Sequence, residues 1–185
     1  MTILILGLLM WVGAHFFKRL MPEQRAAMGD KGKLLVAVGI ILSLVLMIYG
    51  YRAADVVPVW NPPAMLTGIN NVLMVFAFYM YGASAAKPAK VWIGTKVRHP
   101  QLTAVKIWAF AHLLVNGDVA SIILFGGMLA WAVVSVILIN KAEGPWTPPP
   151  QAPVRKEYVL IAITLVLVII VSTVHVLMGV NPFGG

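Results

Sequence analysis

Long apolar runs separated by short polar segments dominate this sequence. A helix that crosses a bilayer needs about 20 mostly apolar residues, with about 17 as the lower end. The mean hydropathy of +0.91 and the 11% of charged residues exclude an ordinary soluble domain, in which roughly a quarter of residues are charged. The sequence therefore predicts an all-α fold, a polytopic membrane helix bundle. The five plain apolar stretches are residues 3–17, 34–51, 66–81, 119–139 and 158–178.

A sixth apolar stretch, at residues 102–115, is shorter than the other five. When it is extended to residues 99–116, it comes close to the lower limit for a transmembrane helix. We interpret it as a short sixth span, with a re-entrant segment as the alternative. The chain of 185 residues has room for one such bundle and no separate soluble domain. We therefore expect a single transmembrane domain over residues 1–185.

The positive charges lie in alternate loops of the predicted bundle. The loops after the first, third and fifth spans are basic, whereas the loop after the second holds only Arg52 and the C-terminal tail holds no cation. Because cytoplasmic loops are enriched in Lys and Arg, this asymmetry predicts six transmembrane helices, N-out and C-out. Five spans would break the alternation. The cations of the three basic loops are Lys18, Arg19, Arg25, Lys31, Lys33, Lys87, Lys90, Lys96, Arg98, Lys141, Arg155 and Lys156.

Composition also excludes whole classes of function. The net charge of +8 is spread over these loops without a basic-aromatic motif, so we expect the lipid bilayer as a partner and no nucleic acid. The chain has no cysteine, which excludes disulfides, thiolate metal sites, iron–sulfur clusters and the attachment of c-type haem. Any metal would have to bind through His, Asp, Glu or Met. The oligomeric state is left open.

The stretch "KIWAFAHLLVNGD", residues 106–118, carries four polar side chains inside apolar surroundings. Gly117 is a natural left-handed terminator for one helix, and Asp118 is a good N-cap for the next. Together with Asn116 they predict a tight outer turn. Lys106 can extend along its own stem to the cytoplasmic headgroups, so we expect no catalytic role for it.

His112 lies inside the short span at residues 99–116, which is the fourth of the six in chain order. Trp108, His112 and Asn116 follow one another at intervals of four residues, so they share one face of a helix that should point into the bundle. One interpretation is a histidine that is hydrogen-bonded to a neighbouring helix. The other is a functional site, because ionisable residues within membrane spans are costly and usually functional.

The other histidines are distributed over both sides of the predicted membrane. His15 and His99 lie nearer the cytoplasmic side, whereas His175 lies near the outer end of the last span, at a depth similar to that of His112. Two neutral imidazoles that face each other across a bundle are a natural axial pair for b-type haem, which needs no cysteine. Depth therefore favours His112 with His175.

Two arginines are candidates for binding the haem propionates. Arg52 would serve a haem on the outer side, and Arg98 one on the inner side. Arg98 belongs to the tripeptide "RHP", in which Pro100 suits the first turn of a helix. The same tripeptide has a second interpretation, a helix start that binds a phosphate or carboxylate.

The block "RHPQLTAVKIWAFAHLLVNGDVASIILFGG" resembles the signature of the NnrU family, as do "GLLMWVGAHFFKR" near the beginning and "HVLMGVNPF" near the end. The family takes its name from an association with nitrite and nitric oxide metabolism in denitrifying bacteria. A domain of this family occurs in the plant cis-zeta-carotene isomerase, a membrane protein that binds b-type haem through histidine. The resemblance implies a multi-pass protein of the bacterial inner (cytoplasmic) membrane.

The resemblance also implies particular metal ligands. The positions that correspond to the haem ligands are His112, in "AHLL", and His15 in the first span; we rank His15 second and keep His175 as the alternative second ligand. Trp108 shares the face of His112 and is a candidate haem contact. The "RHP" element is also similar to one in isoprenylcysteine methyltransferases, but the acidic residues that follow it there are missing here, which argues against methyl transfer.

Two functions from different classes remain. The first is a haem b protein with a redox-linked or isomerase-like role that is connected to nitrite and nitric oxide metabolism. The second is a non-enzymatic accessory or assembly factor for a nitrite or nitric oxide reductase, in which case reductase or other membrane subunits would be partners. The presence of bound haem distinguishes them.

Overall fold

The computed structural model describes residues 1–85 and 89–183, and this part of the chain is helical and contains no strand. The all-α prediction is confirmed. Lys87, one of the predicted loop cations, lies outside the described residues. The long helices are α1 (Thr2–Leu20), α3 (Gly29–Arg52), α4 (Met65–Ala83), α5 (Pro100–Val115), α7 (Gly127–Glu143) and α8 (Arg155–Leu177), and the short ones are α2 (Pro22–Ala27), the 3-10 turn η1 (Trp92–Thr95), α6 (Val119–Ser121) and the π-helical turn η2 (Ile122–Gly126).

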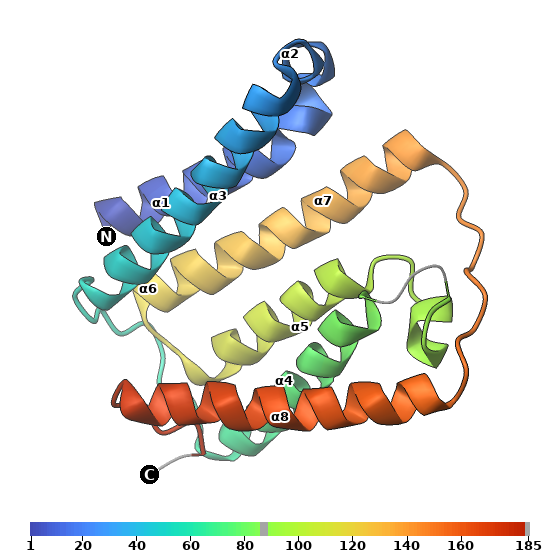
Figure 1. Cartoon of the computed structure of the whole chain (residues 1–185). Helices are drawn as coiled ribbons and strands as arrows, with labels where there is room; N and C mark the ends of the chain where they lie inside the picture. The colour runs from blue at the N-terminus through green and yellow to red at the C-terminus, as the bar shows by residue number, and fades with distance from the viewer. Residues whose placement is uncertain (86–88, 184–185) are drawn as a thin grey trace.

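The long helices form a row in which each packs on the next, in the order α3, α1, α7, α5, α4, α8 (Figure 1). Successive long helices along the chain run in opposite directions, so α1 and α7, which are neighbours in the row, run in the same direction; the two termini lie at the same end of the bundle. We call this the terminal end, and the opposite end, where Lys18, Arg98 and Arg155 lie, the basic end. The alternate loops that are rich in cations therefore meet at one end, as the charge pattern predicts.

Five of these helices, α1, α3, α4, α8 and the continuous segment 119–143, are long and apolar enough to cross a membrane. α5 has 16 residues, which corresponds to about 24 Å at 1.5 Å per residue. Pro100, at its start, lies beside Leu138 and Ile139 near the end of α7, whereas Val115, at its end, precedes the segment that starts α7. α5 therefore runs from the basic end to the terminal end. Multiple spans are supported, while the sixth span and the sidedness stay predictions.

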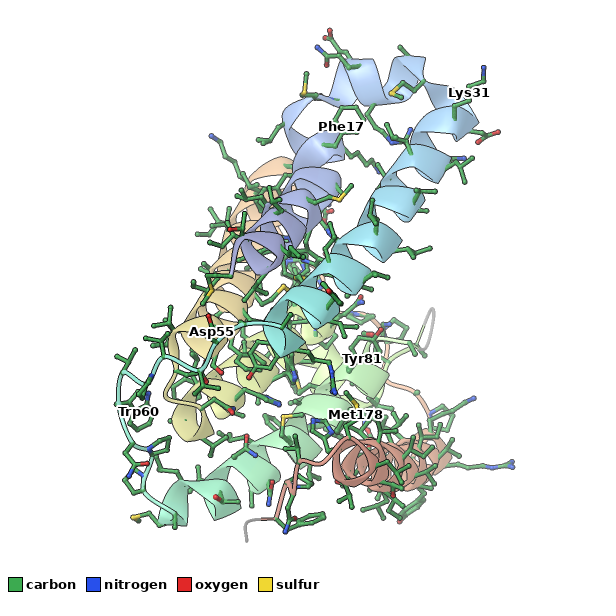
Figure 2. All side chains as sticks on the ribbon, turned by 90° about the vertical axis from the view of Figure 1, so that its left-hand side faces the viewer. Phe17, Lys31, Asp55, Trp60, Tyr81 and Met178 are labelled. Atoms are coloured by element: carbon green, nitrogen blue, oxygen red, sulfur yellow. The ribbon has the colours of Figure 1, made fainter. Side chains whose placement is uncertain are left out.

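The outer helices of the row expose apolar side chains. Ile41 on α3 is 63% exposed, and Ile169 on α8 is 65% exposed. Figure 2 views the bundle from the terminal end, with Asp55, Trp60 and Met178 towards the viewer, and shows side chains projecting outward from α3 and α8. So much exposed apolar surface is unusual for a soluble monomer and matches a lipid bilayer as the solvent.

α1 and α3 pack closely because glycines face the partner helix. A Cβ on Gly50 would lie 2.4 Å from the backbone nitrogen of Leu4, and a Cβ on Gly7 would lie 2.8 Å from that of Met47. In a bilayer, where lipid tails are as apolar as side chains, such close packing is a main source of helix association. Leu4 is fully buried as a result.

The two consecutive glycines of the segment 119–143, Gly126 and Gly127, have different environments. A Cβ on Gly127 would meet Leu8 of α1 at 2.3 Å, whereas Gly126 has no atom within 4 Å of its Cβ position. The lack of a side chain at Gly127 therefore lets Leu8 of α1 approach this segment closely. The π-helical turn η2 directly precedes Gly127, a feature that the sequence did not reveal.

The turn between α5 and α6 is confirmed at Asp118 and corrected at Gly117. The Asp118 carboxylate accepts a hydrogen bond from the Ser121 backbone N–H at 3.0 Å and so caps α6. Gly117 does not adopt the left-handed conformation that we predicted. Gly117 is needed because a Cβ there would lie 2.0 Å from the carbonyl oxygen of Trp60, in the loop between α3 and α4. The backbone N–H of Trp60 donates to the Gly117 carbonyl.

Candidate functional site

The predicted ligand His112 lies in a group of aromatic rings near the terminal end of α5. Its ring stacks on Phe125 of η2, with centroids 4.6 Å apart and planes at 28°. Trp108 packs edge-on against the same Phe125 at 5.2 Å, and Tyr51 of α3 reaches Phe125 from the other side at 6.0 Å. We call His112, Trp108, Phe125 and Tyr51 the His112 cluster. The predicted association of Trp108 with His112 is present, with centroids 5.4 Å apart.

The hydrogen bonds of His112 determine which nitrogen can bind a ligand. Nδ1 lies 2.9 Å from the carbonyl oxygen of Trp108, which can only accept, so Nδ1 carries the proton. In the neutral ring, Nε2 then has the free lone pair. Asn116 does not face the imidazole; its Nδ2 donates to the backbone carbonyl of His112 at 2.8 Å and so closes the end of α5. The two polar residues of the predicted face thus have separate roles: His112 presents an imidazole, whereas Asn116 completes the end of α5.

His175 on α8 has the same local arrangement. Its Nδ1 lies 2.8 Å from the carbonyl oxygen of Val171, which leaves Nε2 with the lone pair. His175 and His112 lie on α8 and α5, which both pack on α4. The pairing of these two histidines stays a prediction.

His15 lies in a different group of rings. Its Nδ1 donates to the carbonyl oxygen of Trp11 at 2.8 Å, and its ring centroid lies 4.2 Å from that of Trp11 and 4.8 Å from that of Trp131 on α7. His112 contacts Phe125 of η2. Phe125 lies six residues before Trp131, which corresponds to about 9 Å along a helix axis. Within the described residues, no ring contact joins the two groups. The structure thus places His15 and His112 apart.

His15 faces a cavity of about 570 Å³ at the basic end of the bundle. Ligand pockets in proteins span roughly 300–1,000 Å³. The ends of α1 and α7, the start of α5 and the connector between α7 and α8 surround this cavity. Arg98, the predicted inner arginine, lines it together with His15, so the structure unites these two candidates. Arg52, the outer candidate, is an exposed residue at the end of α3.

Sequence reasoning missed two residues of this cavity and its surroundings. Arg19 lines the cavity from α1, and the Glu143 carboxylate lies between Arg19 and Arg98, at 3.5 Å from Nη2 of Arg19 and 3.4 Å from Nη2 of Arg98. Arg98 also donates to the carbonyl oxygen of Gly144 at 2.6 Å. No sequence spacing connects positions 19, 98 and 143, so only the packing of three helix ends could reveal the arrangement.

The described residues contain no group of three or more His, Cys, Asp or Glu side chains that could hold a bare metal ion. A haem iron makes a smaller demand on the protein, because the porphyrin supplies four nitrogens and the protein one or two axial ligands. The donor set at His112 and His175, two imidazoles with free Nε2 atoms, fits that demand.

The model of one protein family, described as "NnrU protein", matches residues 3–182 of the chain. The chain belongs to the NnrU family. The resemblance in "RHP", "AHLL" and "NGD" is thereby confirmed over nearly the whole length. No curated protein and no solved structure matches the chain.

Within this NnrU protein, the three motifs have separate structural positions. "RHP" borders the basic cavity, "AHLL" carries the imidazole of the His112 cluster, and "NGD" caps the next helix and bonds to the outer loop. A functional interpretation of the family signature should therefore treat the two ends of α5 separately.

Proposed function

We propose that this NnrU protein is a six-span protein of the bacterial inner membrane that binds b-type haem through His112, with His175 as the second axial ligand. The observation that carries the proposal is the pair of imidazoles on α5 and α8. Each has its Nδ1–H bonded to a backbone carbonyl, and the helices that carry them, α5 and α8, both pack on α4. A hydrogen bond of this kind fixes the orientation of a ligating histidine and raises its basicity.

The residues around His112 suit an apolar cofactor. Phe125 stacks on the imidazole, and Trp108 packs against both rings, so the surroundings of the imidazole are largely aromatic. In such surroundings an unsatisfied ring nitrogen is costly, and a metal bond would satisfy Nε2. A bound haem would supply one-electron redox chemistry at the iron.

We further propose that the protein's role is redox-linked or isomerase-like and belongs to nitrite and nitric oxide metabolism. This part rests on the family resemblance. The position of the cluster, nearer the terminal end than the cytoplasmic basic end, would place the haem in the outer half of the membrane.

The test is the visible spectrum of the purified chain after expression with ample haem. We expect a Soret band and a six-coordinate, low-spin spectrum. His112→Ala should remove most of the haem, and His175→Ala should leave a weaker or high-spin spectrum. His99→Ala is the matched control, because His99 bonds to Asn140 at the basic end and should not affect the haem.

Two outcomes would change the conclusion. If His15→Ala rather than His175→Ala produces the high-spin spectrum, the second ligand is the one that the family resemblance implies. If the wild type binds no haem, or if His112→Ala leaves the spectrum unchanged, the haem proposal fails. An accessory factor for a nitrite or nitric oxide reductase would then be the leading function.

A further inference from the structure

We infer that the cavity at the basic end is a separate binding site for a phosphate group, carried either by a lipid headgroup or by a small soluble phosphate. The inference does not depend on haem. It starts from charge: Arg19, Lys90 and Arg98 line the cavity, and none of its described lining residues is acidic. Glu143, just outside the lining, lies between Arg19 and Arg98 and offsets one of these two charges.

The two arginines are held in place and still have donors to offer. Glu143 and Gly144 take one N–H of Arg19 and two of Arg98, while each guanidinium has five N–H groups. The side chain of Arg98 is only 18% exposed, so its charge has lost most of its water. Planar, pre-oriented guanidinium groups in such surroundings bind phosphate oxygens strongly.

The start of α5 contributes further donors at the same place. Pro100 occupies the first turn, and no side chain caps this end of the helix. The backbone N–H groups of Gln101 and Leu102 therefore have no carbonyl acceptor within the helix. Both residues line the cavity. The partial positive charge of a helix N-terminus favours an anion there.

One buried donor of a residue in the cavity wall has no hydrogen-bond partner among the described residues. The indole Nε1–H of Trp131 is buried and has no hydrogen-bond partner among the described residues, and Trp131 lines the cavity with only 8% of its surface exposed. Buried donors in native proteins almost always have an acceptor. An oxygen-rich ligand in the cavity would provide one.

The remaining wall of the cavity is apolar. Phe16, Leu102, Leu138 and Trp146 complete it, so a ligand with a polar head and an apolar tail would find both parts matched. A lipid phosphate has this character, and the basic end is where the cytoplasmic headgroups are expected. A free phosphate would use the cationic part alone.

The experiment measures phosphate binding by the full-length protein purified in detergent. Titration calorimetry with inorganic phosphate reports the soluble source. Native mass spectrometry with dioleoyl phosphatidic acid, compared with dioleoyl phosphatidylcholine, reports the lipid source. We expect the wild type to bind at least one of the two phosphate probes and to prefer phosphatidic acid to phosphatidylcholine.

Three substitutions should weaken this binding. Arg19→Gln and Arg98→Gln should each weaken it about tenfold or more, as expected for the loss of a charge-assisted hydrogen bond. Gln101→Glu is the sharpest variant, because it is isosteric and exposed and adds a negative charge beside the cavity. An acidic residue in the first turn of a helix is stabilising, so Gln101→Glu should fold at least as well as the wild type while it loses the phosphate.

Arg155→Gln and Lys18→Gln are the matched controls. Both residues are exposed at the same end of the bundle and lie outside the cavity lining, so their removal changes the net charge equally. If these controls weaken binding as much as the cavity variants, only general surface charge is at work and the inference is overturned. The same follows if the wild type binds no phosphate probe.

Haem content separates this inference from the proposed function. Arg98→Gln and Gln101→Glu should leave the haem spectrum unchanged. If they lose haem together with phosphate, the cavity belongs to the haem and the inference is overturned, while haem binding stands. If the wild type contains no haem but binds phosphate as expected, the proposed function fails and this inference stands.

Discussion

The ring of His112 on α5 stacks on the ring of Phe125, with 4.6 Å between centroids and 28° between planes. Phe125 belongs to the π-helical turn η2, a widened turn of a kind often found at functional sites. The same ring contacts Trp108 and Tyr51. One side chain of η2 thus joins α3, α5 and α7 around the proposed haem ligand.

Phe125→Ala should destabilise the protein by about 3 kcal/mol, because Phe125 is 5% exposed and its removal leaves a cavity among three helices. Thermal unfolding in detergent measures the loss. Phe110→Ala is the control: Phe110 lies on α5 as well but is 50% exposed, so its removal should change the stability much less. Equal losses in the two variants would show that Phe125 does not join the helices as described.

Asp118→Ala should cost about 1 kcal/mol of stability, because it removes the cap of α6, whereas Asp118→Ser and Asp118→Asn should cost much less. The Asp118 carboxylate also accepts from the hydroxyl of Ser121 at 2.5 Å, and Ser121 is bonded to Tyr51 at 2.8 Å. Unfolding temperatures of the three variants test this. A loss of haem in Asp118→Ser without any loss of folded protein would contradict a purely structural role.

Gly117→Ala should destabilise the protein by about 1–3 kcal/mol, because the new Cβ would meet the carbonyl oxygen of Trp60 at 2.0 Å and displace the outer loop. Limited proteolysis should then cut the loop near Trp60 faster. Gly126→Ala is a control for which we expect the opposite change in stability. It has free space around its Cβ position and lies within a helix, so it should stabilise by up to about 1 kcal/mol.

The charge asymmetry of the loops predicts the orientation in the membrane. Alkaline phosphatase needs disulfides and is active only when it is exported. A fusion after residue 181, at the terminal end, should therefore be active, whereas a fusion at Gln151, in the connector at the basic end, should be inactive. The reverse result would invert the orientation. Activity at both sites would indicate that α8 does not cross the membrane.

Several properties of the chain could be predicted because they depend on short stretches alone. Hydropathy over about 20 residues predicts membrane helices whatever their neighbours are, and the charge of each loop predicts its side of the membrane. The cap at Asp118 depends on four consecutive residues, and the structure confirms it. The family signature is likewise a property of the sequence, and the match over residues 3–182 confirms it.

Other properties required the tertiary structure, because they depend on how each helix is rotated and which helices are neighbours. Depth and family resemblance gave His112 different partners; packing places His15 beside Trp131, in a different group of rings from His112. The role of Gly117 depends on the carbonyl of Trp60, more than fifty residues away in the chain. The cavity of Arg19, Arg98 and Trp131 exists only where the ends of α1, α5 and α7 meet. Hydropathy shows that a helix is buried in lipid or protein, but only side-chain contacts between helices decide which of its faces meets which neighbour.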